Sequence, residues 1–267
     1  KYTPESHNDG IATYFREYLR SYMKTWVNEN PKPDGTKYNL YLDGLKVYTT
    51  IDSKMQIYAE AAVKAHMKQL QKAFDAENNR KKNATYPFVK VTKDEYNNLI
   101  ERAMKSSNRW IHLKYLGYSE KEIRESFDKK VEMRVFSWKG ERDTVMTPRD
   151  SILYYKAFLR TGMMSMEPQT GHIKAWVGGI NYKHFQYDQV AQGARQTGSS
   201  FKPFVYATAI DQLHYSPCLE LPDIQTCIEA GKYGNVQAWC PRNSTGNFSG
   251  KMMRSEEHTS ELQSLRE

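Results

Sequence analysis

The pattern of hydrophobic and polar residues at the start of the chain predicts one helix and then a break. Apolar side chains recur at helical spacing over residues 8–28, which predicts an amphipathic helix with Asn8 or Asp9 as its N-cap. Two prolines and a glycine interrupt the pattern at residues 30–35. Because proline and glycine are the strongest local breakers, we expect a linker at that position.

The pattern from residue 45 to residue 160 predicts helices interspersed with short strands. Residues 45–50 alternate like a strand, and Asp52 then precedes a long apolar-periodic run that ends near Phe74. The same reasoning predicts a helical stretch over residues 90–128 with a helix start at 119–122, a strand over 131–135, and a helix over 149–160. The sequence contains no internal repeat.

Residues 162–177 have the signature of a β-hairpin. A short strand at 162–166 is followed by the turn residues Glu-Pro-Gln-Thr-Gly at 167–171, and residues 172–177 alternate as the return strand. Two glycines end this strand, and a polar loop then leads to the sequence Gly198-Ser199.

The segment that begins at Gly198 carries candidate chemistry. Ser199 and Lys202 are three residues apart at the predicted start of a helix, so their side chains stand on one face, one turn apart. A serine hydroxyl needs a nearby base to act as a nucleophile, and a desolvated lysine is such a base. The glycine permits a sharp turn, and the helix N-terminus offers N–H groups to a developing oxyanion. The same S-x-x-K spacing at Ser21–Lys24 lies inside a helical pattern without a glycine turn, and we interpret it as a solvated face.

Four segments, in order, resemble the class A penicillin-binding proteins, which are bifunctional enzymes that polymerise and cross-link bacterial peptidoglycan. The runs MMSMEPQTGHIKAWVGG and ARQTGSSFKPFVYATAID are similar to the opening of the transpeptidase domain. DGLKVYTTIDSKMQIYAEAAV resembles the strand and helix that lead into that domain. WCPRNSTGNFSGKM resembles the P-x-N-x-x-x-x-x-x-G segment that follows the active-site helix.

The resemblance implies an α/β (α+β) fold in which an antiparallel sheet is flanked by helices, as in transpeptidases and β-lactamases. It implies four regions: a trailing edge of the glycosyltransferase region with a linker (1–44), an interdomain linker region (45–160), the N-terminal part of the transpeptidase domain (161–253) and a non-native tail (254–267). The tail is assigned because residues 254–264 resemble a translated sequencing adapter.

The implied reaction is D,D-transpeptidation without a cofactor or metal. Ser199 would attack the penultimate D-alanine carbonyl of a stem peptide, Lys202 would accept its proton, and β-lactams would acylate the same serine. The family's S-x-N and K-T/S-G motifs do not follow Ser199 in this chain; Ser106–Asn108 matches S-x-N by letters but precedes it. We therefore expect a fragment that is inactive by itself. The alternatives are a serine β-lactamase or β-lactam sensor of the same fold, and a non-catalytic scaffold module.

Composition limits the possible partners. The net charge is +8, but lysine and arginine are scattered and mixed with acids, which argues against a nucleic-acid partner and favours a solvated loop at 80–82. No run of 18 apolar residues occurs, so a membrane-spanning helix is not expected here. The resemblance places the intact protein in the bacterial cell envelope, anchored in the cytoplasmic membrane through a missing N-terminal segment and facing the periplasm.

The remaining candidate residues have ordinary interpretations. Cys218, Cys227 and Cys240 lack metal-ligand spacing and are either free thiols or, in an oxidising periplasm, include a pair between Cys227 and Cys240. His172 and His184 have no acidic neighbour at catalytic spacing, which favours surface histidines. Aromatic residues that could line a sugar groove, but more often belong to a core or an interface, are Trp110, Tyr115, Trp138, Tyr154 and Tyr155.

Overall fold

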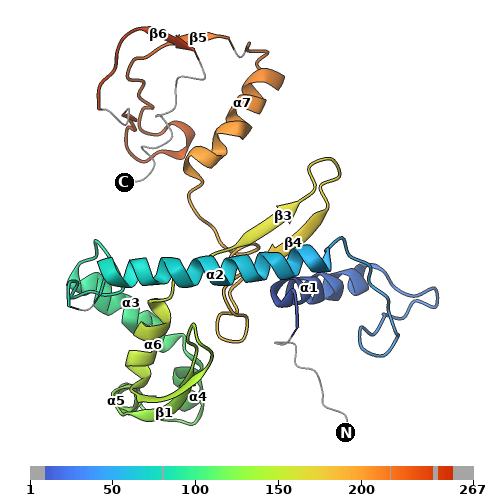
Figure 1. Cartoon of the computed structure of the whole chain (residues 1–267), viewed down its shortest axis with the longest axis vertical. Helices are drawn as coiled ribbons and strands as arrows, with labels where there is room; N and C mark the ends of the chain where they lie inside the picture. Colours follow the sequence, from blue (N-terminus) through green and yellow to red (C-terminus); the bar gives the residue numbers. More distant parts are fainter. Residues whose placement is uncertain (1–9, 80, 217, 243–245, 255–267) are drawn as a thin grey trace. The chain divides into compact units, whose positions relative to one another are not determined.

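The computed structural model describes residues 10–79, 81–216, 218–242 and 246–254 (Figure 1). The chain divides into two compact units, residues 1–193 and residues 194–267. The regular secondary structure of the described residues consists of helices and small two-stranded antiparallel sheets. This composition confirms the α+β class expected from the sequence.

The first helix, α1 (Thr13–Glu29), begins five residues later than the sequence pattern predicted. Gly10 and Ala12 both have left-handed backbone conformations, with φ of 85° and 55°, which a right-handed helix cannot continue through. Ala12 therefore occupies the N-cap position, and its N–H donates to Glu60 Oε1 of the next helix at 2.8 Å. The expected caps Asn8 and Asp9 lie outside the described residues. The predicted break after the first helix is confirmed: α1 ends at Glu29, and a turn follows within residues 30–36.

The segment 45–50 is not a strand, contrary to the sequence pattern. Two hydrogen bonds tie the end of this segment and the residue that caps α2 to strand β4 (Ile173–Val177): Thr50 Oγ1 donates to Ile173 O at 2.8 Å, and Asp52 N donates to Lys174 O at 2.9 Å. Alternation predicts an extended backbone, but a strand also needs a continuous ladder of hydrogen bonds, and none forms here. Helix α2 (Ser53–Glu77) then starts at the predicted cap, where Asp52 accepts from Met55 N at 2.9 Å.

The middle of the first unit has its own hydrophobic core. Its elements are α3 (Lys93–Lys105), α4 (Asn108–Tyr115), α5 (Glu120–Phe127), the antiparallel strands β1 (Val131–Val135) and β2 (Arg142–Met146), and α6 (Pro148–Lys156). Helices α3 and α5 begin with complete capping boxes, at Thr92 with Glu95 and at Ser119 with Glu122. The buried core side chains are Ile100, Met104, Trp110, Ile123, Phe127 and Leu153.

Helix α6 ends at Lys156 and not at residue 160 as predicted. The reason is a side chain from a distant helix. The N–H of Leu159 donates to Gln71 Oε1 of α2 at 2.9 Å, and Gln71 Nε2 donates to Ala157 O at 3.0 Å. These bonds replace the helical bonds that would have continued α6.

The predicted hairpin is confirmed as β3 (Met163–Met166) paired antiparallel with β4, with a register shift between Ser165 and Met166. Both faces of β4 are covered. Ala175 and Val177 pack against α2, while the ring of Trp176 lies 5.0 Å from that of Tyr18 on α1. Figure 1 shows α2 running between this hairpin and the helices α3 and α6.

A buried glutamine covers the free edge of β4. Gln56 of α2 is completely buried; its Oε1 accepts from Trp176 N at 2.7 Å and its Nε2 donates to Trp176 O at 2.9 Å. A side-chain amide carries one donor group and one acceptor, the same pair that a neighbouring strand presents. Gln56 thus satisfies backbone groups of β4 that would otherwise be buried without partners.

The two glycines after β4 accommodate Tyr14 of α1. Tyr14 is 5% exposed and its Oη donates to Phe185 O at 2.5 Å. Burial raises the pKa of Tyr14 well above its usual range, so the hydroxyl remains a donor. A Cβ atom at Gly178 would lie 2.7 Å from Tyr14 Cδ1, and one at Gly179 would lie 2.8 Å from its Cζ. Only glycine allows this close packing of α1 on the hairpin.

The second unit begins with a short 3₁₀ helix, Gly198–Phe201, that continues into α7 (Lys202–Asp211). The elements that follow are β5 (Glu220–Pro222), a 3₁₀ turn at Lys232–Gly234 and β6 (Met252–Arg254). Strand β6 pairs antiparallel with β5.

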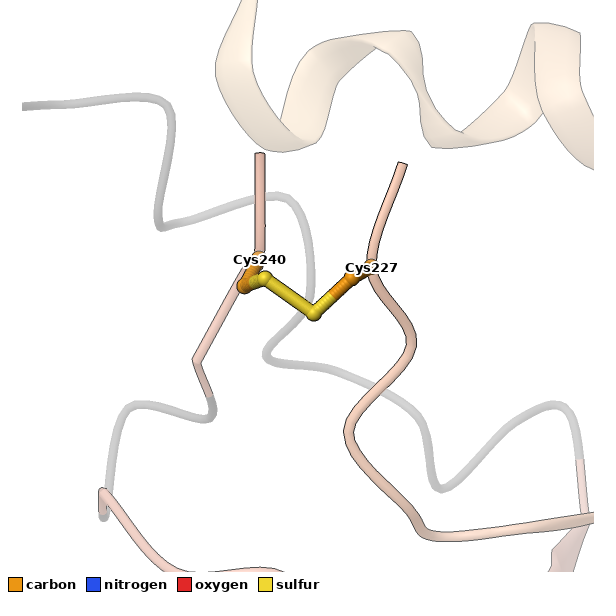
Figure 2. Close-up of a disulfide and its surroundings, with 2 residues drawn as sticks. All are labelled: Cys227 and Cys240. Atoms are coloured by element: carbon orange, nitrogen blue, oxygen red, sulfur yellow. A yellow bond between two sulfur atoms is a disulfide. The ribbon is translucent and has the colours of Figure 1, made fainter. Parts of the chain in front are cut away.

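Figure 2 shows the disulfide between Cys227 and Cys240, whose Cα atoms are 4.3 Å apart. Ile228 and Trp239 exchange two backbone hydrogen bonds of 2.8 Å inside this loop. Of the two interpretations of the cysteines, the structure thus contains the pair, and Cys218 is a free, exposed thiol.

Candidate active site

Ser199 lies in the turn that opens the second unit's long helix. Gly198 has φ of 53°, a conformation that glycine adopts readily, and the 3₁₀ turn starts there. The N–H of Lys202 donates to Ser199 O, which closes this turn. The sequence predicted an α-helical start; a 3₁₀ turn aligns residues i and i+3 even more closely. Ser199 and Lys202 are therefore brought to the same side of the helix start.

Within the second unit, Ser199 and Lys202 lie at a surface that is accessible to solvent. Ser199 is exposed and Lys202 is half-buried. Because the dipoles of α7 sum along its axis, its N-terminal turn is the positive end of the helix. The arrangement offers a hydroxyl nucleophile, an amine one turn away and a positive helix end, which are three of the groups that acyl transfer requires.

The apolar residues of α7 (Lys202–Asp211) are not buried in the second unit, although their run in the sequence is apolar enough for a buried helix. No residue of α7 is buried, and Phe204 is 66% exposed. Exposed apolar residues also flank it at Phe201 and Leu213. The sequence pattern identified the helix correctly, but burial depends on a covering element, and none of the described second unit buries this surface.

The two other motif matches have structural roles. Ser21 and Lys24 lie on the exposed surface of α1, as predicted. Ser107, within the S-x-N letters at 106–108, is the N-cap of α4: its Oγ accepts from Trp110 N at 3.2 Å and donates to Met104 O at 2.6 Å. A serine that caps a helix needs no catalytic explanation.

The aromatic residues do not form one groove. Trp110 is buried in the middle core and Tyr115 is 86% exposed at the end of α4. Trp138, Tyr154 and Tyr155 belong instead to a second cluster, centred on Phe136, Phe158 and Phe185. Trp110 is therefore a core residue, and the five aromatic residues do not line a common sugar-binding groove.

His184 has an acidic partner that the sequence did not reveal. Its Nε2 lies 2.6 Å from Glu141 Oε1, and its Nδ1 lies 3.1 Å from Tyr155 Oη. Lys183 Nζ lies 2.9 Å from the same carboxylate. Lys183 and, to a lesser degree, His184 lower the pKa of Glu141 below its usual range. Because 43 residues separate the histidine from the glutamate, only the fold brings them together. His172 Nδ1 is 3.9 Å from Glu167 Oε2 across the hairpin turn; the histidine is exposed and the glutamate is half-buried.

Neither a metal site nor a membrane span is found in the part of the chain that the structure describes. Over those residues, no group of three His, Cys, Asp or Glu side chains is placed to hold a metal ion. Over the same residues, no helix is both long enough and apolar enough to cross a bilayer. Lys81 and Lys82 are exposed in a turn after α2, as predicted for that basic run, whereas residue 80 lies outside the described residues.

Comparisons with known proteins identify relatives of the chain. Residues 83–159 match the family model of the penicillin-binding protein middle domain. The chain is similar to "Penicillin-binding protein 1A" of Neisseria cinerea (23% identity, 91% of this chain, 32% of the relative) and of Rickettsia prowazekii strain Madrid E (24%, 90% and 31%). The protein of the same name from Neisseria lactamica is 34% identical over 34% of this chain and 11% of its own. A crystal structure of Penicillin-Binding Protein 1A from Haemophilus influenzae resembles 91% of this chain and 36% of that one, with 19% identity and a TM-score of 0.45.

The chain spans about a third of the length of the relatives that it matches almost throughout. The middle-domain match covers α3 to α6, with their separate hydrophobic core. The matches named Penicillin-binding protein 1A extend over most of the chain, on both sides of that core. The resemblance noted in the sequence is thereby confirmed: the chain is similar to proteins named Penicillin-binding protein 1A over most of its length, and residues 83–159 match the penicillin-binding protein middle domain.

Proposed function

We propose that the intact protein takes part in peptidoglycan synthesis and cross-links stem peptides as a serine D,D-transpeptidase through Ser199. The observation that carries the proposal is the 3₁₀ turn at Gly198, which sets Ser199 one turn before Lys202 at the positive end of α7. The relatives named Penicillin-binding protein 1A support the choice of substrate class. Peptidoglycan glycosyltransferase activity is proposed for the region of the intact protein that precedes residue 1.

The proposed reaction has two acyl-transfer steps. Lys202 accepts the Ser199 hydroxyl proton as Oγ attacks the carbonyl of the penultimate D-alanine, and the terminal D-alanine leaves as an amine that takes up a proton. The amine of a second stem peptide then attacks the acyl-enzyme. The new peptide bond forms, Ser199 leaves as the hydroxyl, and the amine loses its proton. A β-lactam acylates Ser199 by the same first step.

The site needs further groups that we place beyond this chain. In the implied family pattern the S-x-N and K-T/S-G motifs follow the active-site helix, and strands of the same sheet come with them. The exposed apolar residues of α7 are consistent with a surface that those strands cover in the intact protein. We likewise propose that the protein is held in the cytoplasmic membrane of the bacterial envelope by a segment before residue 1 and faces the periplasm.

The test is covalent labelling of the intact protein with a fluorescent penicillin. Ser199→Ala should abolish labelling, whereas Ser200→Ala, the matched exposed neighbour, should retain it. If Ser200→Ala abolished labelling and Ser199→Ala retained it, the nucleophile would be Ser200 and not Ser199. A transpeptidase should keep the label, whereas a β-lactamase would release it by hydrolysis and a scaffold would never acquire it.

A second substitution tests the role of the amine. Lys202→Arg keeps the positive charge, but a guanidinium does not readily lose its proton in a protein. Acylation should therefore fall at least ~100-fold, the low end of what a positioned acid–base group contributes. Near-normal acylation by Lys202→Arg would rule out this lysine as the base.

The chain of 267 residues should not label by itself. Removal of one oxyanion donor costs about 10²–10³ in rate, and we expect the missing strand to supply such a donor together with the S-x-N side chains. Stoichiometric, Ser199-dependent labelling of residues 1–267 would show that the missing part is not required.

A further inference from the structure

A cavity of about 370 Å³ lies in the first unit, formed by three elements that are distant in sequence. Helix α2 contributes Lys64, and the connection between β1 and β2 contributes residues 136–141. The loop that follows β4 contributes Ile180, Asn181 and Lys183. The volume falls in the range of sites for small ligands, and all of its lining belongs to the unit that does not contain Ser199.

The charges around this cavity are mostly positive. Lysines line it from all three elements: Lys64, Lys139 and Lys183. One acidic residue, Glu141, lies among them, and its carboxylate is already engaged by Lys183 at 2.9 Å and His184 at 2.6 Å. The same two partners hold the pKa of Glu141 low, so it remains ionised and neutralises Lys183. Within the described ranges, Lys64 and Lys139 make no ion pair, and both are exposed.

The wall of the cavity also carries an aromatic surface. Trp138 is half-buried and its ring is fixed edge-to-face against Phe136, with centroids 5.5 Å apart. The indole N–H of Trp138 is buried and has no hydrogen-bond partner among the residues described. Asn181 uses its Oδ1 to accept from His184 N at 3.1 Å.

We propose that this cavity binds a small anionic carbohydrate, that is, a sugar bearing a phosphate or a carboxylate. The aromatic wall is suited to the apolar face of a sugar ring, because tryptophan offers a large, rigid apolar surface with a polar edge. The two lysines without carboxylate partners supply the charge for the anionic group. The site is separate from the proposed transpeptidase chemistry and does not depend on it.

The experiment measures binding to the 267-residue chain by saturation-transfer NMR and calorimetry, with glucose 6-phosphate, glucuronate and glucose as probes. At least one anionic sugar should bind, with its ring protons saturated from the protein, and glucose should bind more weakly. Comparison of the phosphate with the carboxylate identifies the preferred anion. Absence of binding by both anionic sugars, or equal binding of glucose, would overturn the proposal.

Paired variants localise the site. The double variant Lys64→Gln, Lys139→Gln should weaken binding about fivefold or more, since each exposed charge contributes a modest share of the free energy. The matched double variant Lys72→Gln, Lys81→Gln removes two exposed lysines of the same unit that do not line the cavity, and its affinity should be unchanged. Equal weakening by both pairs would mean that the anion responds only to net charge, which would refute the site. Unfolding curves of all variants exclude loss of the fold as the cause.

Discussion

The side chain of Gln56 provides the sharpest test of how the first unit is held together. It is completely buried, and it bonds both the N–H and the carbonyl of Trp176 in β4. Gln56→Leu keeps a similar volume but removes both bonds and leaves two buried backbone groups without partners. Each such group costs about 1–3 kcal/mol, and the added apolar burial offsets part of this, so we expect a loss of about 2–4 kcal/mol.

This loss should be measurable by thermal and urea unfolding followed by circular dichroism. For a unit of this size, about 2–4 °C of Tm is lost per kcal/mol, which gives a decrease of roughly 5–15 °C. The Trp176 amide should also exchange its hydrogen faster. Gln69→Leu, an exposed glutamine of the same helix, is the matched control and should change Tm little. Equal effects of the two substitutions would refute the idea that Gln56 satisfies the edge of β4.

A charged variant gives an independent check through pH. In Gln56→Glu, a carboxylate would face the carbonyl of Trp176 and the carboxylate of Glu60, which lies 2.8 Å from Gln56 Nε2. Burial and the like charge should raise the pKa of the new carboxyl above its unfolded value. The variant should therefore be most stable, relative to the parent chain, below the unfolded pKa and lose stability as the pH rises through the folded pKa. A variant that is destabilised equally at all pH values would contradict this.

Three further perturbations test other contacts. Gly179→Ala should lower the free energy of unfolding of the first unit by about 2–3 kcal/mol, because the new Cβ would overlap the ring of Tyr14; unchanged urea unfolding would contradict that packing. Replacement of Cys227 and Cys240 by alanine should destabilise the second unit by about 3 kcal/mol, since the disulfide closes a short loop, and limited proteolysis should cleave that unit faster while the first unit is unaffected. The pKa of Glu141 is lowered in the folded state, so the parent chain should be more stable than Glu141→Gln above the unfolded pKa of about 4.3. This advantage in free energy of unfolding should disappear as the pH falls through the folded pKa. An advantage that persists when Glu141 is fully protonated would exclude the ion pairs as its source.

Local signals made much of the fold predictable. The start of α2 at Asp52 and of α5 at Ser119 followed from capping residues that act within one turn. The hairpin at 163–177 followed from alternation around a turn sequence. The boundaries that failed depend on distant partners. Gln71 ends α6 across 86 residues, and no local pattern contains that information.

The same distinction separates the two candidate sites. Ser199 and Lys202 are three residues apart, so the sequence alone indicated that they could cooperate. Glu141 and His184 meet only because the β1–β2 connection and the loop after β4 lie together. The cavity beside them is lined from three elements, and periodicity within one element cannot predict such a site.

The two buried glutamines of α2, Gln56 and Gln71, make the length of that helix a fixed dimension. Gln56 holds the hairpin and Gln71 holds the end of α6, so their sequence separation of 15 positions (71 − 56) sets a spacing of roughly 22 Å at 1.5 Å per residue. One inserted residue would turn one amide by about 100° away from its backbone partners. Four inserted residues would nearly restore the direction and lengthen the spacing by about 6 Å. The helix thus acts as a spacer whose register can change only by whole turns, and this couples the position of the middle domain to that of the hairpin.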